Sequence, residues 1–332
     1  MNSYGTLFRI QLFGESHGVA IGVVIDGVPP GLPLSTEDFQ NDLSRRKGGS
    51  FGTTSRVEEE RIQFLSGVFD GKTTGTPLAM VVENHNTLSS DYEQIRHIPR
   101  PGHADFTSKV KYGGCNDWRG AGHHSGRVTL ALVLAGVVAK RVIAPIVINS
   151  AIVAIGGENP WDDKLRSVIE EGDSIGGIIE CRIKNVPAGI GEPFFDSVES
   201  TIAHLIFAIP GIRGIEFGDG FKAAGMKGSE HNDPIISPHG ATSRNGAGGI
   251  NGGISNGNQI LFRVAVKPTS SIPKVQESYN FATGKIEKFS IGGRHDACFA
   301  LRTPVVIEAA SAIALSDLWL QASSSGANNL SK

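Results

Sequence analysis

Apolar residues at helical spacing predict an amphipathic helix over Leu34–Arg46. Phe39 and Leu43 stand four residues apart, so they share one face of such a helix. Ser35 followed by Asp38 has the spacing of a capping box, which satisfies free backbone N–H groups where a helix begins. The segment therefore carries both a start signal and an apolar face.

Other segments also favour helices. Val128–Val142 is apolar on nearly every face, so we expect it to be buried. Ser197–Ala208 carries one apolar stripe, and Pro210 stops it. Thr303 is a capping residue with proline at the first helical position, and the helix that it opens is expected to reach about Leu320.

Alternation of apolar and polar residues predicts strands at Ile178–Ile183, Gln259–Val266 and the shorter Gly22–Asp26. In the first of these, Ile179 faces one side and Glu180 the other. Because helices and alternating strands occur in one chain, the fold class is expected to be α+β.

Two stretches of the chain echo each other. Val23–Leu43 and Cys181–Leu205 both read as a strand, then V-P-x-G starting at Val28 and Val186, then a Pro-containing loop and a capped helix. Two interpretations of this similarity stay open. It arises by chance, or two related β–loop–α units lie in two halves of one fold.

No low-complexity linker separates the echoing stretches, so we expect one domain over residues 1–332 with a shared core. Its pseudo-related halves would cover about 1–145 and 146–320. The polar residues 321–332 are expected to form a frayed tail.

Composition excludes several classes of protein. Lys plus Arg number 31 against 33 Asp plus Glu, so a net charge of −2 provides no global positive field for nucleic acid or an anionic membrane. The longest apolar stretch, Val128–Ala139, is too short to span a bilayer, and no secretory signal is visible. The 3 cysteines are isolated, which favours free thiols. We expect a cytoplasmic protein that binds neither nucleic acid nor membrane.

A basic, glycine-containing segment precedes the buried helix. Arg119, His123, His124 and Arg127 crowd together there, and like charges are tolerated best when an anion compensates them. A solvated basic turn is the alternative. Farther along, Lys267–Ser271 follows a strand and offers a lysine and hydroxyls to a phosphate, although Ser/Thr-rich turns are common.

His17 and His103 each lie beside glycine in a polar loop, where an imidazole can act as acid or base. A structural role is the alternative for each. The sequence lacks H-E-x-x-H, the P-loop pattern, a Rossmann G-x-G-x-x-G after its first strand, and G-x-S-x-G. We therefore expect no metal site. The residues predict an enzyme for a multiply anionic small molecule.

Several glycine-rich blocks resemble the chorismate synthase family in order and spacing. The blocks are FGESHG (13–18), DGVPPGLPL (26–34), LSGVFDGKTTGTP (65–77), RPGHAD (100–105), GGISNG (252–257), KPTSSI (267–272) and GRHDAC (293–298). The match runs from about Tyr4 to about Leu320. It implies a β-α-β sandwich subunit in a homotetramer.

The resemblance implies a reaction as well as a fold. Members convert 5-enolpyruvylshikimate 3-phosphate to chorismate, the last common step of aromatic amino-acid biosynthesis by the shikimate pathway. The 3-phosphate and a ring C6 hydrogen leave by anti-1,4-elimination. Reduced FMN is required although it is not consumed. The chain has no room for a reductase domain, so an external flavin reductase or other reductant is expected.

Site residues follow from the same resemblance. The substrate would be bound by Arg46, Arg119, Arg127 and Arg294. Arg46 would also contact NADP, although the loop that carries Arg46 is shorter here than in the family. His17, His103 and Asp296 would be catalytic, with Ser16 or Ser125 as a proton relay. Flavin would contact His123, His124, Ser125, Pro210, Gly211, Gly252, Lys267, Pro268, Thr269, Ser270, Ser271 and Arg294.

The chain departs from the family pattern at three positions. Many members have Arg and Ser where this chain has His123 and His124, and Glu where it has Val128. Two rival hypotheses stay open: a non-catalytic flavin-binding or electron-transfer module, and an inactive paralogue. Phosphate release from the enolpyruvyl substrate would separate them from the enzyme.

Overall fold

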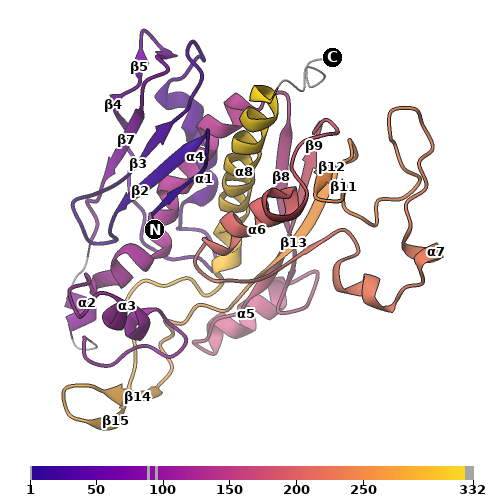
Figure 1. Cartoon of the computed structure of the whole chain (residues 1–332). Coiled ribbons are helices and arrows are strands. Elements are labelled where there is room, and N and C mark those ends of the chain that lie inside the picture. The colour runs from indigo at the N-terminus through magenta and orange to yellow at the C-terminus, as the bar shows by residue number, and fades with distance from the viewer. Residues whose placement is uncertain (1, 88–89, 94–95, 326–332) are drawn as a thin grey trace.

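Two antiparallel sheets enclose a pair of long helices, α4 (Thr129–Val142) and α8 (Pro304–Ser324). This computed structural model describes residues 2–87, 90–93 and 96–325. Figure 1 shows one sheet on each side of the two helices, so the layers are sheet, helix pair and sheet. The expected α+β sandwich is confirmed.

The first sheet comes from the N-terminal part of the chain and the second from the C-terminal part. In spatial order, the first contains β1 (Ser3–Tyr4), β2 (Arg9–Gly14), β3 (Ala20–Asp26), β7 (Leu78–Glu83) and β4 (Gln63–Ser66). The second contains β10 (Ile212–Phe217), β13 (Ile260–Val266), β9 (Gly177–Lys184) and β8 (Val147–Ile155).

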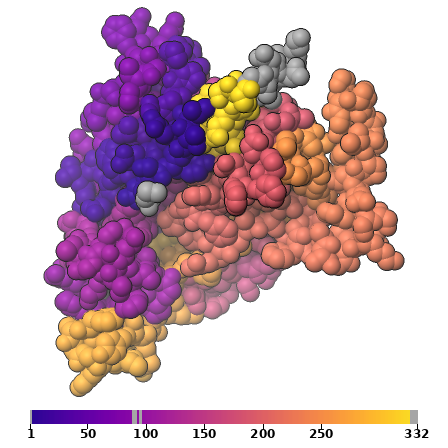
Figure 2. Space-filling model, viewed as in Figure 1, coloured from indigo at the N-terminus to yellow at the C-terminus, as the bar shows by residue number. Residues whose placement is uncertain are grey.

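Shorter elements surround this body. The small hairpins are β5 (Val68–Phe69) with β6 (Lys72–Thr73), β11 (Ile250–Asn251) with β12 (Ile254–Ser255), and β14 (Gln276–Asn280) with β15 (Lys285–Phe289). The other α-helices are α1 (Gln40–Arg46), α2 (Ser90–Glu93), α3 (Asp105–Lys111), α5 (Asp162–Glu170), α6 (Val198–Phe207) and α7 (Gly228–His231). The 3-10 turns are η1 (Thr36–Phe39), η2 (Arg119–His124), η3 (Gly126–Val128), η4 (Phe194–Asp196), η5 (Gly220–Gly225) and η6 (Phe299–Arg302). In Figure 2 the segment around α7 and the β14–β15 hairpin project from the body.

Most predicted elements are present with shifted ends. The helix expected over Leu34–Arg46 is the turn η1 followed by α1, and the Ser35 N–H donates to the Asp38 carboxylate at 2.9 Å. In β9 the predicted inward residues Ile179 and Cys181 are fully buried. Helix and strand periodicity thus located the core correctly.

The predicted frayed tail was wrong at its start, because α8 continues through residues 321–324. The Gln321 side chain donates to Asp317 Oδ2 one turn earlier at 3.1 Å, and Ser323 Oγ donates to the Trp319 carbonyl at 2.8 Å. These bonds extend the helix beyond Leu320. Residues 326–332 lie outside the described part of the chain.

In the described part of the chain, α8 is the helix long and apolar enough to cross a membrane by length and composition. The sequence prediction missed it because Glu308, Ser311 and Asp317 interrupt the apolar run. In the fold, 78% of its most apolar window is buried inside the protein, between α4 and the second sheet. It packs as a core helix.

The two echoing stretches form units with the same order of elements. β3 leads through Val28 into η1 and α1, and β9 leads through Val186 into α6. Both valines are buried, and Gly31 and Gly189, three residues later, have φ of +84° and +101°. A shared origin of the two units remains a prediction.

The two central helices touch at a glycine. A Cβ built on Gly136 of α4 would lie 2.3 Å from the Cβ of Ala309 and 2.5 Å from its Cα, both on α8. Because neither backbone can shift without disturbing a sheet, this contact fixes the distance between the two halves.

We expect Gly136→Ala to lower the free energy of unfolding by about 1–3 kcal/mol through overpacking. The control is Gly228→Ala in α7, where no atom of the described chain lies within 4 Å of the added Cβ, and a change within about 0.5 kcal/mol is expected. Urea unfolding of both variants measures this. Equal stability of the two variants would contradict the close contact of α4 with α8.

Candidate active site

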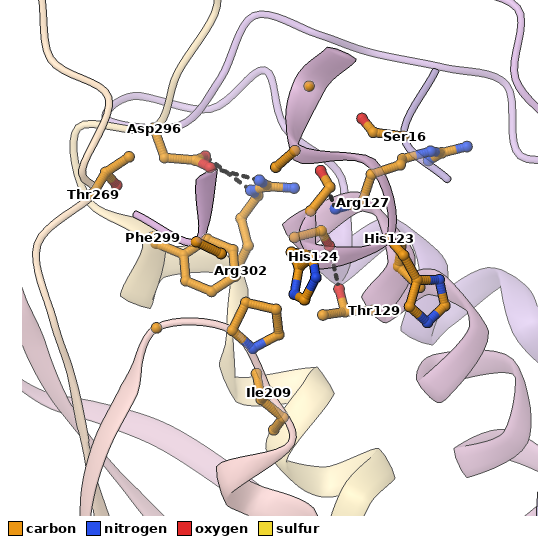
Figure 3. A pocket seen from close by; sticks show the side chains of 18 of the residues that line it. Ser16, His123, His124, Arg127, Thr129, Ile209, Thr269, Asp296, Phe299 and Arg302 are labelled. Atoms are coloured by element: carbon orange, nitrogen blue, oxygen red, sulfur yellow. Dashed lines mark hydrogen bonds and ion pairs between the residues drawn. The ribbon is translucent and has the colours of Figure 1, made fainter. Parts of the chain in front are cut away.

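A cavity of about 960 Å³ is lined by loops from both halves of the chain. Figure 3 shows side chains from these loops pointing into it, including His124 and Phe299. The sequence-predicted residues that line the cavity are Ser16, His17, Arg46, His103, His123, His124, Ser125, Arg127, Pro210, Gly211, Lys267, Pro268, Thr269, Ser270, Ser271, Arg294 and Asp296. The fold thus brings together groups up to 280 positions apart in the chain.

Two predicted residues do not line the cavity. Arg119 makes a two-pronged ion pair with Asp117, with both N–O distances 2.9 Å, and its side chain is 41% exposed. Gly252 lies in the turn between β11 and β12, with no described atom within 4 Å of an added Cβ. The structure of the single chain therefore does not support a ligand contact for either residue.

Alternating buried charges run along one wall, and we call them the Arg–Glu ladder. Arg56 Nε donates to Glu58 at 2.7 Å, and Arg127 reaches Glu58 at 3.4 Å and Glu60 at 2.5 Å. Arg46 then donates to Glu60 at 3.0 Å. The three guanidinium groups outnumber the two carboxylates, so the ladder retains one positive charge.

Arg46 has a structural role in the ladder, because its donors are used by groups of the protein itself. Its side chain is 3% exposed, and it donates to Thr129 Oγ1 and to the carbonyls of Gly126 and Arg127 as well as to Glu60. Burial lowers the pKa of Arg46 to about 9, so it stays charged at neutral pH. Its donors hold the turn η3, which leaves little surface for substrate or NADP.

Other arginines are more available to a ligand. Arg294 binds only the side-chain oxygen and carbonyl of Asn86, at 3.0 and 3.3 Å, and no carboxylate of the described chain lies within ion-pair distance. Arg56 donates to Ser16 Oγ at 3.2 Å as well as to Glu58. Both arginines line the cavity and offer positive charge next to His17.

His17 lies at the junction of these cationic groups. Its ring packs edge-on against Tyr92 with the centroids 5.4 Å apart. Burial, then Arg56 and Arg119, lower the pKa of His17 below its usual value of 6.5. The imidazole is therefore mainly neutral at pH 7, and a bound anion would favour its protonated form.

His103 also lines the cavity and lies just before the start of α3. Its Nδ1 is 2.7 Å from Asp105 Oδ1, and burial lowers the pKa of His103 despite that carboxylate. Lys267 closes this side, because its Nζ donates to the Gly102 carbonyl at 2.8 Å and to Ser270 Oγ at 2.6 Å. The Lys267–Ser271 loop and the His103 loop are thus bonded together.

Four buried polar atoms of cavity-lining residues lack hydrogen-bond partners in the described chain. They are Glu60 Oε2, His103 Nδ1, His124 Nε2 and Thr269 Oγ1. Burial also lowers the pKa of His124, so its ring is a neutral donor or acceptor. Since buried polar atoms are rarely left unpaired, these atoms indicate a polar ligand. His123 is different, because its Nδ1 bonds to the Gly14 carbonyl at 2.7 Å.

Asp296 is held by Arg302 on the far wall, as the dashed lines in Figure 3 show. Arg302 donates to Oδ1 at 2.9 Å and to Oδ2 at 2.6 Å, and the Thr54 N–H adds a bond to Oδ1 at 2.9 Å. Ser125 Oγ is likewise engaged, because it caps η3 by accepting from the Arg127 N–H at 3.3 Å.

Sequence reasoning missed several cavity residues. Arg56, Glu58 and Glu60 belong to a charged run to which the sequence analysis gave no role, although a run of acids beside arginines is a signal for buried pairs. Arg100 begins the quoted block RPGHAD, and Arg302 directly precedes the predicted helix cap. Within the described ranges, no group of three or more His, Cys, Asp or Glu is arranged to hold a metal ion.

The sandwich and its cation-lined, histidine-containing cavity define an enzyme that binds a small anionic molecule. A family model described as chorismate synthase matches residues 8–320. A chorismate synthase from Chitinophaga pinensis is 56% identical over 321 residues, covering 96% of this chain and 97% of the relative. One from Dehalococcoides mccartyi is 44% identical over 353 residues, covering 97% of each.

A solved structure titled "Crystal Structure of Chorismate Synthase" superposes with a TM-score of 0.74 at 28% identity, covering 96% of this chain and 93% of that one. The chain belongs to the chorismate synthase family, and it is an enzyme.

The ladder predicts acid sensitivity. Burial raises the pKa of Glu58, but Arg127 and Arg56 outweigh burial and hold it below the usual 4.5. The contribution of ionised Glu58 to the free energy of unfolding is therefore complete above pH 4.5. It is lost as the pH falls through the lowered pKa of Glu58. Glu58→Gln should lower the free energy of unfolding by about 3 kcal/mol at pH 7 and flatten its pH dependence below 4.5.

The control is Glu59→Gln, because Glu59 forms an exposed pair with Arg61 and its side chain is 72% exposed. Its stability should stay within about 0.5 kcal/mol of the parent at every pH. Urea unfolding between neutral and acidic pH measures both variants. Indistinguishable pH curves for the two would contradict a buried, charged Glu58.

Proposed function

We propose that the chain converts 5-enolpyruvylshikimate 3-phosphate to chorismate and phosphate, with reduced FMN as cofactor. The observation that carries the proposal is the single cavity that holds both predicted histidines, the Arg–Glu ladder and the Lys267–Ser271 loop. Membership of the family supports the reaction class. The reaction is a lyase step of aromatic amino-acid biosynthesis.

The substrate carries a phosphate and two carboxylates, so it needs several cations. Arg56 and Arg294 have donors to spare, and Arg127 stands behind them in the ladder. The carboxylates of Glu58 and Glu60 offset the electrostatic repulsion between the arginines of the ladder. Exclusion of water by the bound substrate would strengthen each of these contacts by lowering the local dielectric.

In the 1,4-elimination, the bond from ring C3 to the phosphate oxygen and the C6–H bond both break. The existing C1–C2 double bond shifts, so that the product ring has double bonds at C2–C3 and C1–C6. We assign His17 to the departing phosphate, because its ring lies beside Arg56 and Ser16. The incoming trianion would raise the lowered pKa of His17. Its imidazolium then donates a proton or hydrogen bond to the leaving oxygen.

Four features of the cavity wall support a flavin there. Thr269 Oγ1 and His124 Nε2 are two of its buried polar atoms without a hydrogen-bond partner in the described chain, and Lys267 with Ser270 offers cationic and hydroxyl donors to a phosphate. Burial and Arg213 lower the pKa of Lys267, and a phosphate dianion would offset both effects. When bound, reduced FMN would supply an electron-rich ring that makes loss of the allylic phosphate easier.

Asp296 is proposed to accept a proton at Oδ2, which takes one bond from Arg302 whereas Oδ1 takes two bonds. Ser16 or Ser125 would relay that proton. His103 is proposed to hydrogen-bond or protonate the flavin ring. A homotetramer, an external reductant and a cytoplasmic location belong to the same proposal, whereas the buried Arg46 gives no support to NADP binding there.

The test is anaerobic. Purified chain, reduced FMN and 5-enolpyruvylshikimate 3-phosphate are mixed, and phosphate release is followed with and without the cofactor. We expect release only with reduced FMN. Flavin binding without phosphate release would favour an electron-transfer module or an inactive paralogue. His17→Ala should cut turnover by about 100-fold while flavin binding is largely kept.

A glycine beside His17 gives a sharper test. A Cβ on Gly120 would lie 2.7 Å from His17 Cδ2 and 2.9 Å from Ser16 Oγ, and its φ is +55°. Gly120→Ala should therefore displace the imidazole and lower kcat by about 100-fold.

The matched control is Gly113→Ala, with φ of +59° and no described atom within 4 Å of the added Cβ. Both variants should lose about 1–2 kcal/mol of stability from the left-handed backbone, but only the first should lose turnover. Thermal unfolding and phosphate release measure the two effects. Equal kcat in both variants would contradict the role given to His17.

A further inference from the structure

Strand β10, at the edge of the second sheet, begins with a β-bulge. Its antiparallel pairing with β13 joins Ile212 to Val266 and then Gly214 to Ala265, so Arg213 is an extra residue with no partner position on β13. Bulges occur often next to active sites, where they change the direction of a side chain. Arg213 is exposed on the edge strand and lines the cavity.

The bulge decides which residues of β10 face the core. Ile212 is buried, and Ile215 and Phe217 pack against the core. Residues on one face of a regular strand are two positions apart, whereas Ile212 and Ile215 are three apart. Without the extra residue, Glu216 would follow Ile212 on the inward face. The bulge therefore adds an arginine at the cavity while the apolar residues of β10 keep facing the core.

Arg213 and its cationic neighbour Lys267 lack acidic partners. Among the described residues, no carboxylate lies within ion-pair distance of either side chain, and both side chains line the cavity. Burial and then Arg213 lower the pKa of Lys267, so the two positive charges are close enough to repel each other. Neighbouring cations without a carboxylate are tolerated best when an anion binds both of them.

The loop after β13 adds hydroxyl groups next to these cations. The Lys267 backbone N–H donates to the Gly211 carbonyl at 2.9 Å, which ties the loop to the segment that carries Arg213. Lys267 Nζ donates to Ser270 Oγ at 2.6 Å, and the buried Thr269 Oγ1 has no hydrogen-bond partner in the described chain. A phosphate monoester presents three terminal oxygens and two negative charges, so it matches two cations and a free hydroxyl.

We propose that Arg213 is a phosphate-binding residue, which the bulge of β10 directs to a phosphate monoester that Lys267 and Thr269 also bind. The charge of the ligand follows from these three side chains. That the monoester is the phosphate of FMN rests on the proposed function. The 3-phosphate of the enolpyruvyl substrate has the same chemistry, so the experiment has to separate the two sources.

The test is equilibrium binding of oxidised FMN and of riboflavin to the full-length protein, followed by flavin fluorescence. The two ligands differ only in the phosphate, so the ratio of their dissociation constants reports the phosphate contact. Arg213→Gln should lower the affinity for FMN by about 10-fold and change the affinity for riboflavin by less than about 2-fold. Arg213→Lys keeps the positive charge and should recover most of the affinity for FMN.

The matched control is Arg182→Gln, which removes the same charge from the same sheet. Arg182 lies on β9, where its guanidinium is 2.6 Å from Glu180 and its side chain is 55% exposed. This variant should keep the FMN-to-riboflavin ratio of the parent. Since Arg182 and Arg213 are both exposed, thermal unfolding of the two variants should stay close to that of the parent.

Binding of 5-enolpyruvylshikimate 3-phosphate, measured by calorimetry, is the second arm. If Arg213→Gln weakens this binding by about 10-fold and keeps the flavin ratio of the parent, the bound monoester is that of the substrate. Equal losses of FMN and riboflavin affinity with unchanged substrate affinity would overturn the proposal. So would three unchanged affinities, or a parent that binds neither phosphate ester.

These readouts separate the phosphate contact from the proposed function, because binding needs no turnover. Selective loss of FMN affinity in Arg213→Gln, with no phosphate release by the parent, would refute the function and keep the contact. Phosphate release by the parent, with every affinity unchanged in Arg213→Gln, would keep the function and refute the contact.

Discussion

The cavity depends on burying positive charge next to the fold's core, and the Arg–Glu ladder makes that tolerable. An arginine taken out of water is costly unless a carboxylate and further hydrogen bonds replace its hydration. Glu58 and Glu60 supply the carboxylates, and Arg46 adds bonds to the carbonyls that precede α4. The wall is therefore rigid and almost neutral before a ligand arrives, while one excess positive charge favours an anion.

The sandwich explains why such distant residues meet. Each half contributes a sheet and one of the two central helices, and the cavity lies where loops from both halves come together. The N-terminal half supplies His17, Arg56 and His103, whereas the C-terminal half supplies the Lys267–Ser271 loop and Arg294. Each half thus contributes both cationic and titratable groups to the cavity, and the spacing of the two halves follows from the packing of α4 on α8.

Periodicity predicted the elements well, and it predicted the ion pairs poorly. The inward faces of β9 and β13 and the burial of α4 follow from residue patterns of two or four positions. The partners of Arg127 are different, because Glu60 is 67 residues away and only tertiary packing brings it close. Arg119 had a local signal in Asp117, two residues earlier, that would have placed it outside the cavity. The end of α8 was misjudged because small polar residues read as a tail, although their side chains bond back to the helix.

The contact of Gly136 with Ala309 has a consequence for how the chain can be divided. α4 packs against β2 and β3 of the first sheet, α8 packs against β8 and β9 of the second, and the two helices pack against each other. A chain cut between α4 and β8 would give two fragments that each expose one helix flank to water. Complementation of the fragments would then rebuild the contact between α4 and α8 and the cavity together, because the residues that line the cavity come from both fragments.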